Sequence, residues 1–149
     1  MNTVDPTWRY YSETVLEIRH ALRVLRVDLR DVLSDELRSD LRCLGGRGEF
    51  GIITAANPLG HQLSGAENDR RRLELEAALN ASDSSFCPAD GVSPDGRHRE
   101  SGFAAWLDDD EVRAVAEQFE QTAFFYFDGA AFWLVTTNGT RDPIRLPAA

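Results

Sequence analysis

Five polar residues lie at positions from which their side chains could bind a ligand or take part in catalysis. Glu100 follows a stretch of turn residues and precedes an apolar segment, so its carboxylate could act as a general base or accept hydrogen bonds from a ligand. Pairing with Arg97 or Arg99 is the structural alternative for Glu100. The other four side chains carry a hydroxyl or an amide, which recognise polar ligands, and are those of Thr54, Asn57, Asn68 and Gln121. If the site is catalytic, Glu100 is the candidate acid or base, and hydrolysis or group transfer is the expected reaction.

Other catalytic chemistries find little support in the sequence. All sixteen basic residues are arginine, which excludes a lysine Schiff base and the phosphate-binding lysine of a P-loop. Cys43 and Cys87 are far apart and lack metal-ligand spacing, so both are interpreted as small buried apolar residues. The acidic run at 108–111 precedes the apolar face of a helix, which favours helix capping over a metal site. We therefore expect no metal and no cofactor.

The candidate site depends on a strand predicted over residues 50–55. This segment is apolar enough to be buried on both faces, and it carries Thr54 near its end. Pairing should stop at Asn57, because Pro58 donates no hydrogen bond to a neighbouring strand. Gln121 starts the first strand of a C-terminal hairpin, on the side of that strand that faces the core. A strand that ends in a polar loop is a common position for a ligand site.

A helix predicted after the loop positions Asn68. Residues 64–67 have the Ser-x-x-Glu form of a capping box, which marks the start of a helix. Asn68 lies seven residues before Leu75 and eleven before Leu79, so its amide is on the face that packs inward. A buried amide needs hydrogen-bond partners. Asn68 should therefore bind a ligand or fasten the loop that follows Asn57.

The whole pattern predicts a single α/β or α+β domain over residues 1–149. We expect a mixed sheet of about five or six strands with helices packed on it and a C-terminal antiparallel hairpin. An N-terminal helix is expected within residues 1–21, and residues 138–149 are expected to form an irregular tail with a turn and a short edge segment. The other expected elements are an amphipathic helix over 8–19, a strand over 25–29, a helix capped by Ser34, a strand over 84–87, turns over 88–96, a strand over 101–107, a helix after 108–111, and hairpin strands over 123–127 and 131–135.

Charge and composition limit the partners. The net charge of −9 disfavours a phosphate backbone, so nucleic-acid binding is not expected. No stretch has the apolar length of a membrane span or a signal peptide, so we expect a cytoplasmic protein without a membrane partner. The run Arg70-Arg71-Arg72 is interpreted as solvated surface paired with Glu74 and Glu76. The oligomeric state is not predicted.

Two classes of function follow from these residues. The first is a binding domain for a polar small molecule, for which nearby arginines would favour an acidic or phosphorylated ligand, with or without catalysis by Glu100. The second is an acidic interaction or inhibitory domain, in which the polar residues fasten loops and the negative surface attracts a basic protein partner. A position of Glu100 in an open cleft would favour the first class.

The order of these motifs resembles the bacterial DUF3293 family, whose function is unknown. The resemblance spans about residues 24–135 and rests on Thr54-Ala55-Ala56-Asn57-Pro58, Ser64, Glu67-Asn68, Asp90-Gly91, Pro94-Asp95, Glu100 and Phe119-Glu120-Gln121-Thr122-Ala123. Ala56 replaces a large aromatic residue and His98 replaces a common tryptophan, so the edges of any shared pocket differ here. The resemblance implies no activity. It implies only that the five candidate residues match the pattern of the family.

Overall fold

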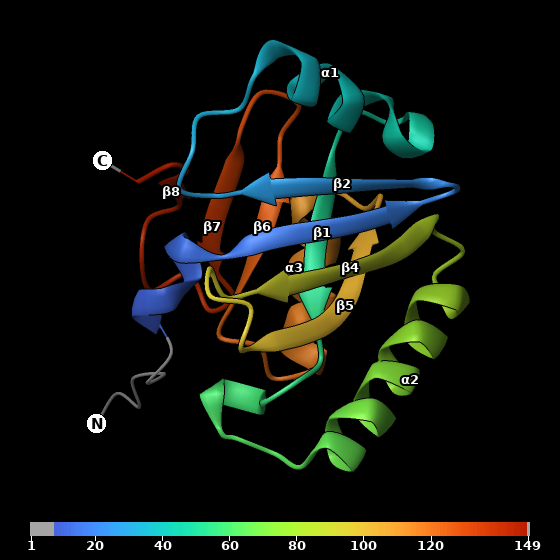
Figure 1. Cartoon of the computed structure of the whole chain (residues 1–149). Coiled ribbons are helices and arrows are strands. Elements are labelled where there is room, and N and C mark those ends of the chain that lie inside the picture. The colour runs from blue at the N-terminus through green and yellow to red at the C-terminus, as the bar shows by residue number, and fades with distance from the viewer. Residues whose placement is uncertain (1–7, 149) are drawn as a thin grey trace.

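The computed structural model describes residues 8–148, which form an α+β domain around one antiparallel sheet (Figure 1). The sheet has eight strands in the order β2-β1-β4-β5-β3-β6-β7-β8. The strands are β1 (Val15–His20), β2 (Arg23–Asp28), β3 (Phe50–Thr54), β4 (Phe86–Val92), β5 (Arg99–Ala105), β6 (Ala123–Phe127), β7 (Phe132–Thr136) and β8 (Ile144–Arg145). The helices are α1 (Asp35–Cys43), α2 (Gly65–Ala81), α3 (Asp109–Gln118) and the short 3-10 helices η1 (Trp8–Glu13), η2 (Leu44–Gly46) and η3 (Pro58–Gly60).

The predicted architecture is confirmed in outline and wrong in the extent of the sheet. A single α+β domain with a β6–β7 hairpin near its C-terminus is observed. The expected mixed sheet of five or six strands is instead an eight-stranded sheet, and every strand pair within residues 8–148 is antiparallel. The α/β alternative fails because it requires a largely parallel sheet, whereas these strand pairs are antiparallel even where α1, α2 and α3 lie between consecutive strands. The short edge segment expected in the C-terminal tail is observed as β8.

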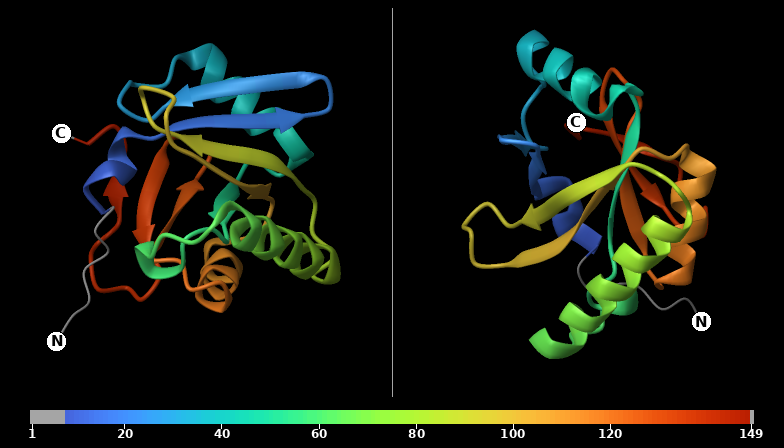
Figure 2. Two further views of the ribbon diagram at one scale, coloured as in Figure 1. Left: turned by 60° about the horizontal axis from the view of Figure 1, so that its bottom comes forward. Right: turned by 90° about the vertical axis from the view of Figure 1, so that its right-hand side faces the viewer.

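The sheet curls so that its two ends meet over one core (Figure 2). Leu25 of β2 and Leu134 of β7 belong to the same buried cluster, although five strands lie between β2 and β7 in the sheet. Leu41 of α1 joins this cluster. The other face of the sheet packs against α2 and α3 through Leu75, Leu79, Val112 and Ala116. β3 lies inside the sheet, and the chain that leaves it passes through η3 into α2 (Figure 1).

The N-terminal helix predicted at residues 1–21, with its amphipathic part at 8–19, is wrong for most of the described residues. η1 ends at Glu13 and β1 begins at Val15, while residues 1–7 lie outside the described part. The three-residue spacing of Val15 and Ile18 fits a helix, but Leu16 is equally buried. β1 is paired on both sides, with β2 and with β4, and its adjacent residues Val15 and Leu16 are both buried although they point to opposite faces of the sheet.

The segment 88–96, predicted as turns, is half strand. β4 extends through Val92, and the connection to β5 starts only at Ser93. Pro88 is tolerated because β1 pairs with β4 only from Ala89 onward, so no partner strand needs a hydrogen bond from position 88 on that side. Asp90 is tolerated because two arginines on neighbouring strands bind its carboxylate. Tertiary contacts thus override the local turn propensity.

The predicted helix starts are confirmed at all three α-helices. Ser34 accepts the amide of Leu37 at 3.1 Å, and Ser64 forms the expected capping box with Glu67. The acidic run at 108–111 also forms a capping box, in which Asp108 accepts the amide of Glu111 at 2.8 Å. These acidic residues therefore begin a helix, as their position in the sequence indicates.

Asp128 fixes the turn between β6 and β7. Its Oδ1 accepts the amides of Ala130 and Ala131 at 2.8 and 2.9 Å, and its Oδ2 accepts the indole N–H of Trp133 at 2.8 Å. Partial burial opposes ionisation, but these hydrogen bonds outweigh it and hold the pKa of Asp128 below its ordinary value. A carboxyl group with a lowered pKa stabilises the folded state at neutral pH, and this contribution is lost as the pH falls through the folded-state pKa.

Asp128→Asn should therefore lower the free energy of unfolding by about 1 kcal/mol at pH 7, with the deficit shrinking below about pH 4. Urea denaturation followed by intrinsic tryptophan fluorescence at pH 7, 5, 4 and 3 measures this difference. Asp142→Asn, which removes the same charge from an exposed loop, is the control. A deficit of Asp128→Asn that is the same at every pH would contradict the role of the ionised carboxylate.

Candidate functional site

The chain that leaves β3 adopts an unusual backbone conformation, with two residues other than glycine at positive φ. Ala55 and Ala56 are buried, and Asn57 then has a φ of +46°, followed by Leu59 with a φ of +53°. Left-handed backbone is tolerated by asparagine but is strained for leucine. The amide of Leu59 donates to the carbonyl of Glu120 at 2.7 Å, and Glu120 itself has a φ of +58°. The exit of β3 and the turn before β6 are therefore bound to each other.

Asn57, Asn68 and Glu100 form one half of a network at this exit. The Asn57 amide nitrogen Nδ2 donates to Glu100 Oε1 at 2.9 Å, and its Oδ1 accepts from Asn68 Nδ2 and from the main-chain N–H of Leu63, both at 3.0 Å. The main-chain N–H of Asn57 donates to Asn68 Oδ1 at 3.0 Å. Of the two alternatives for Asn68, the structure shows the hydrogen bonds that fasten the loop after Asn57, and ligand binding by Asn68 stays a prediction.

Thr54 and Gln121 form the other half, together with Arg71. The Thr54 hydroxyl donates to Gln121 Oε1 at 3.1 Å, and Gln121 Nε2 donates to the carbonyls of Ala56 and Phe119, both at 3.1 Å. Arg71 donates to the carbonyls of Ala55 and Phe119. The expectation that Arg71 is solvated surface is therefore wrong, since its guanidinium binds main-chain oxygens.

The structure thus brings all five candidate residues together around the end of β3. We call Thr54, Asn57, Asn68, Arg71, Glu100 and Gln121 the β3-exit network. Each amide side chain donates and accepts within the protein, so these groups hold the loop in place. Their role in binding a ligand stays a prediction.

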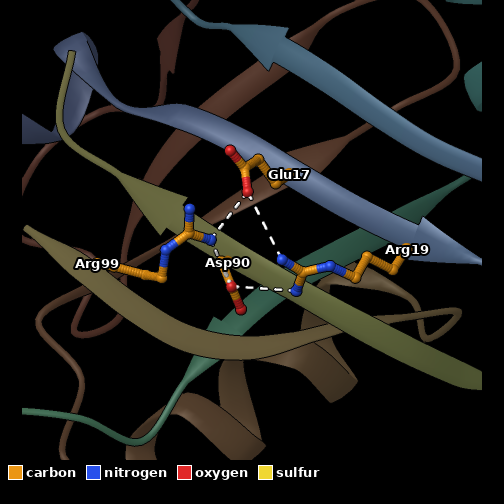
Figure 3. A network of polar contacts seen from close by, with 4 residues as sticks. All are labelled: Glu17, Arg19, Asp90 and Arg99. Carbon is orange, nitrogen blue, oxygen red and sulfur yellow. Dashed lines mark hydrogen bonds and ion pairs between the residues drawn. The ribbon is translucent and has the colours of Figure 1, made fainter. Parts of the chain in front are cut away.

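The arginines near Glu100 have other partners. Arg99 Nη1 lies 2.8 Å from Glu17 Oε1 and 2.7 Å from Asp90 Oδ2, and Arg19 Nη1 lies 3.1 Å from the same Asp90 oxygen (Figure 3). The Asp90 side chain is only 7% exposed, and two guanidinium groups compensate its charge. These charges join β1, β4 and β5. Glu100 accepts a hydrogen bond from Asn57, and Arg99, one of its two alternative partners, binds Glu17 and Asp90.

A pocket of about 290 Å³ lies beside the β3-exit network. We call it the α3–β6 pocket, and its lining consists of Leu59, Glu117, Glu120, Gln121, Thr122, Thr137 and Asn138. Of the five candidate residues, Gln121 lines this pocket. Glu117 and Thr137 were missed by sequence reasoning because neither belongs to a motif. Their only signal is their position, at the end of a helix and just after a strand.

The described residues were expected to hold no metal site and two buried cysteines, and both points can be compared with the structure. Within residues 8–148, no group of three or more His, Cys, Asp and Glu side chains is arranged to hold a metal ion. Cys87 is buried, which raises the pKa of its thiol to about 11, whereas Cys43 is exposed, so the prediction of two buried cysteines is wrong for Cys43. No helix in this part of the chain combines the length and apolar character of a membrane-spanning segment.

Comparison with known proteins supports one similarity. The sequence model of a family described as "Protein of unknown function (DUF3293)" matches residues 53–124. This confirms the resemblance inferred from the motifs over a shorter range, which contains all five candidate residues and ends before Thr137 and Asn138. No curated protein and no solved structure matches the chain. The description of this family names no activity.

Asn68→Ala should lower the free energy of unfolding by about 1–3 kcal/mol, because it removes the acceptor of the Asn57 main-chain N–H and the donor to Asn57 Oδ1. Urea denaturation followed by far-UV circular dichroism measures the change. Asn80→Ala, at an exposed position of the same helix, is the matched control and should stay within about 0.5 kcal/mol of the wild type. Equal stability of the two variants would show that the Asn57–Asn68 pair does not stabilise the loop.

Proposed function

We propose that this protein is a non-catalytic binding domain for a basic protein partner. The observation that carries the proposal is the hydrogen bonding of the β3-exit network. The amides of Asn57, Asn68 and Gln121 bind one another, main-chain groups or neighbouring side chains, and Glu100 accepts from Asn57. Side chains whose hydrogen bonds are made within the protein fit the role of holding a rigid loop next to a pocket better than the role of binding or converting a substrate.

Charge supports a basic partner. The chain carries a net charge of −9, and the two charged residues that line the α3–β6 pocket are Glu117 and Glu120. Two arginines that contact residues of the pocket or their neighbours are bound by the protein itself: Arg71 donates to main-chain carbonyls, and Arg113 donates to the carbonyls of Thr136 and Thr137 at 2.7 and 2.8 Å. A positively charged partner is therefore complementary to this face.

A small-molecule site with Glu100 as acid or base has less support from the geometry. Glu100 accepts a hydrogen bond from Asn57 and is not among the residues that line the α3–β6 pocket. The arginines that favoured an acidic or phosphorylated ligand bind carbonyls or carboxylates of the protein. Catalysis by Glu100 stays a prediction. The variant Glu100→Gln can test it in the same experiments that measure partner binding.

Fluorescence anisotropy with labelled nine-residue peptides tests the proposal. We expect the wild type to bind arginine- or lysine-rich peptides at 50 mM salt, to bind them at least tenfold more weakly at 500 mM salt, and not to bind glutamate-rich peptides. Glu100→Gln should keep the affinity within about twofold, because Glu100 lies outside the pocket.

An unrelated protein of equal net charge is the control and should bind the basic peptides at least tenfold more weakly. Preference for the acidic peptides, or no binding of any basic peptide, would overturn the proposal. So would a loss of basic-peptide binding in Glu100→Gln with unchanged thermal stability, which would instead support a ligand site at Glu100.

A further inference from the structure

We propose that Asn138 is a site of spontaneous deamidation, in which the main-chain nitrogen of Gly139 displaces the side-chain amide. Asn138-Gly139 is the single Asn-Gly pair in the sequence. It lies in the turn that follows β7, where residues 138–143 are all exposed to solvent. The proposal concerns the chemistry of the chain itself and goes beyond the proposed function without resting on it.

The reaction balances with water as its co-reactant. The Gly139 nitrogen bonds to the side-chain carbon Cγ of Asn138, and the amide nitrogen leaves as ammonia, which carries away the proton given up by Gly139. A succinimide ring remains in the main chain. Solvent water then opens this ring at either of its two carbonyl carbons. The product is aspartate or isoaspartate, and each carries one new carboxylate.

Gly139 presents an accessible nucleophile. It has no Cβ beside its nitrogen, its φ is +72°, and the space that a Cβ would occupy is open. Its N–H donates to the Thr136 carbonyl at 3.2 Å, and this bond closes the turn. The bond has to open before the nitrogen can attack. Because the turn is exposed, water can replace the lost hydrogen bond, so opening it costs little free energy.

Two donors of Thr140 bind the oxygen on which negative charge develops. Asn138 Oδ1 accepts the main-chain N–H of Thr140 at 3.1 Å and its hydroxyl at 2.8 Å. Attack on Cγ turns this carbonyl oxygen into an oxyanion, and donors that are already in place stabilise such a charge. Since these bonds link the Asn138 side chain to the residue after Gly139, they also keep that side chain close to the attacking peptide.

The other described asparagines lack this combination of features. Asn57 precedes a proline, whose nitrogen carries no proton to lose and cannot close the ring. The side chain of Asn68 is bonded to the main chain and the side chain of Asn57. Asn80 is exposed, but the residue that follows it still belongs to α2. Asn138 should therefore react faster than these three residues.

The product changes the charge of the α3–β6 pocket. Asn138 lines this pocket together with Glu117 and Glu120, so its conversion to an acid adds a third carboxylate to the lining. The face that is proposed to attract a basic partner thus becomes more acidic as the protein ages. This effect on a partner rests on the proposed function, whereas the deamidation does not.

Incubation of the purified full chain at pH 8.5 and 37 °C, followed by peptide mass spectrometry, measures the reaction. We expect aspartate and isoaspartate to accumulate at Asn138 at least tenfold faster than at Asn80, which is the internal reference. The rate should rise with pH, because the attacking nitrogen has to lose its proton.

Variants of Thr140 separate the turn from the Asn-Gly sequence alone. Thr140→Val removes the hydroxyl donor and should slow the reaction of Asn138 at least threefold in the folded chain. Thr140→Ser keeps the hydroxyl and should react within twofold of the wild type. In 6 M urea, where the turn is absent, all three chains should react at the same rate. Melting temperatures confirm that each variant is folded.

Three results would overturn the proposal. The first is a rate at Asn80 that equals the rate at Asn138. The second is no product at Asn138 during the time in which the urea-unfolded chain reacts completely, which would show that the hydrogen bond from Gly139 to Thr136 protects the site. The third is the same rate for folded Thr140→Val and folded wild type, which would leave Thr140 without a part in the reaction.

Discussion

The organisation of this protein depends on the main-chain polar groups that leave β3 inside the molecule. A strand that ends within a fold leaves N–H and C=O groups that need new partners. Here three of these groups bind side chains: the Ala55 carbonyl accepts from Arg71, the Ala56 carbonyl accepts from Gln121, and the Asn57 N–H donates to Asn68. These partners come from α2 and from the turn before β6, so one local requirement joins a helix, a strand end and a turn. The polar residues that look like a binding site in the sequence meet this requirement.

Features set by local chemistry are predictable from the sequence. The capping boxes at Ser64 and Asp108 involve residues three positions apart, and the turn at Asp128 needs only its own neighbours. The inward face of Asn68 follows from its spacing to the buried leucines of α2. Residue type and strand-end position also indicate two distant contacts of the site, between Asn57 and Glu100 and between Thr54 and Gln121.

Features set by distant contacts are not predictable in this way. β1 has the spacing of a helix and becomes a strand because β2 and β4 pair with it on both sides. β4 contains Pro88 and Asp90, which favour turns. Pro88 lies outside the part of β4 that pairs with β1, and two arginines bind the carboxylate of Asp90. The α3–β6 pocket is harder still to predict, since its lining comes from η3, the end of α3, and the turns before β6 and after β7.

The position of β3 in the sheet has a consequence for how the chain is made. Ile52 pairs with Ala104 on one side and with Phe125 on the other, both far along the chain, whereas β1–β2, β4–β5 and β6–β7 are hairpins. Pairings over such separations form late, because long loops must close first. During synthesis β3 leaves the ribosome before β5 and β6, so this apolar strand stays unpaired on one side until β6 has been made. A chain that ends before β6 would leave one edge of that strand exposed and prone to aggregation.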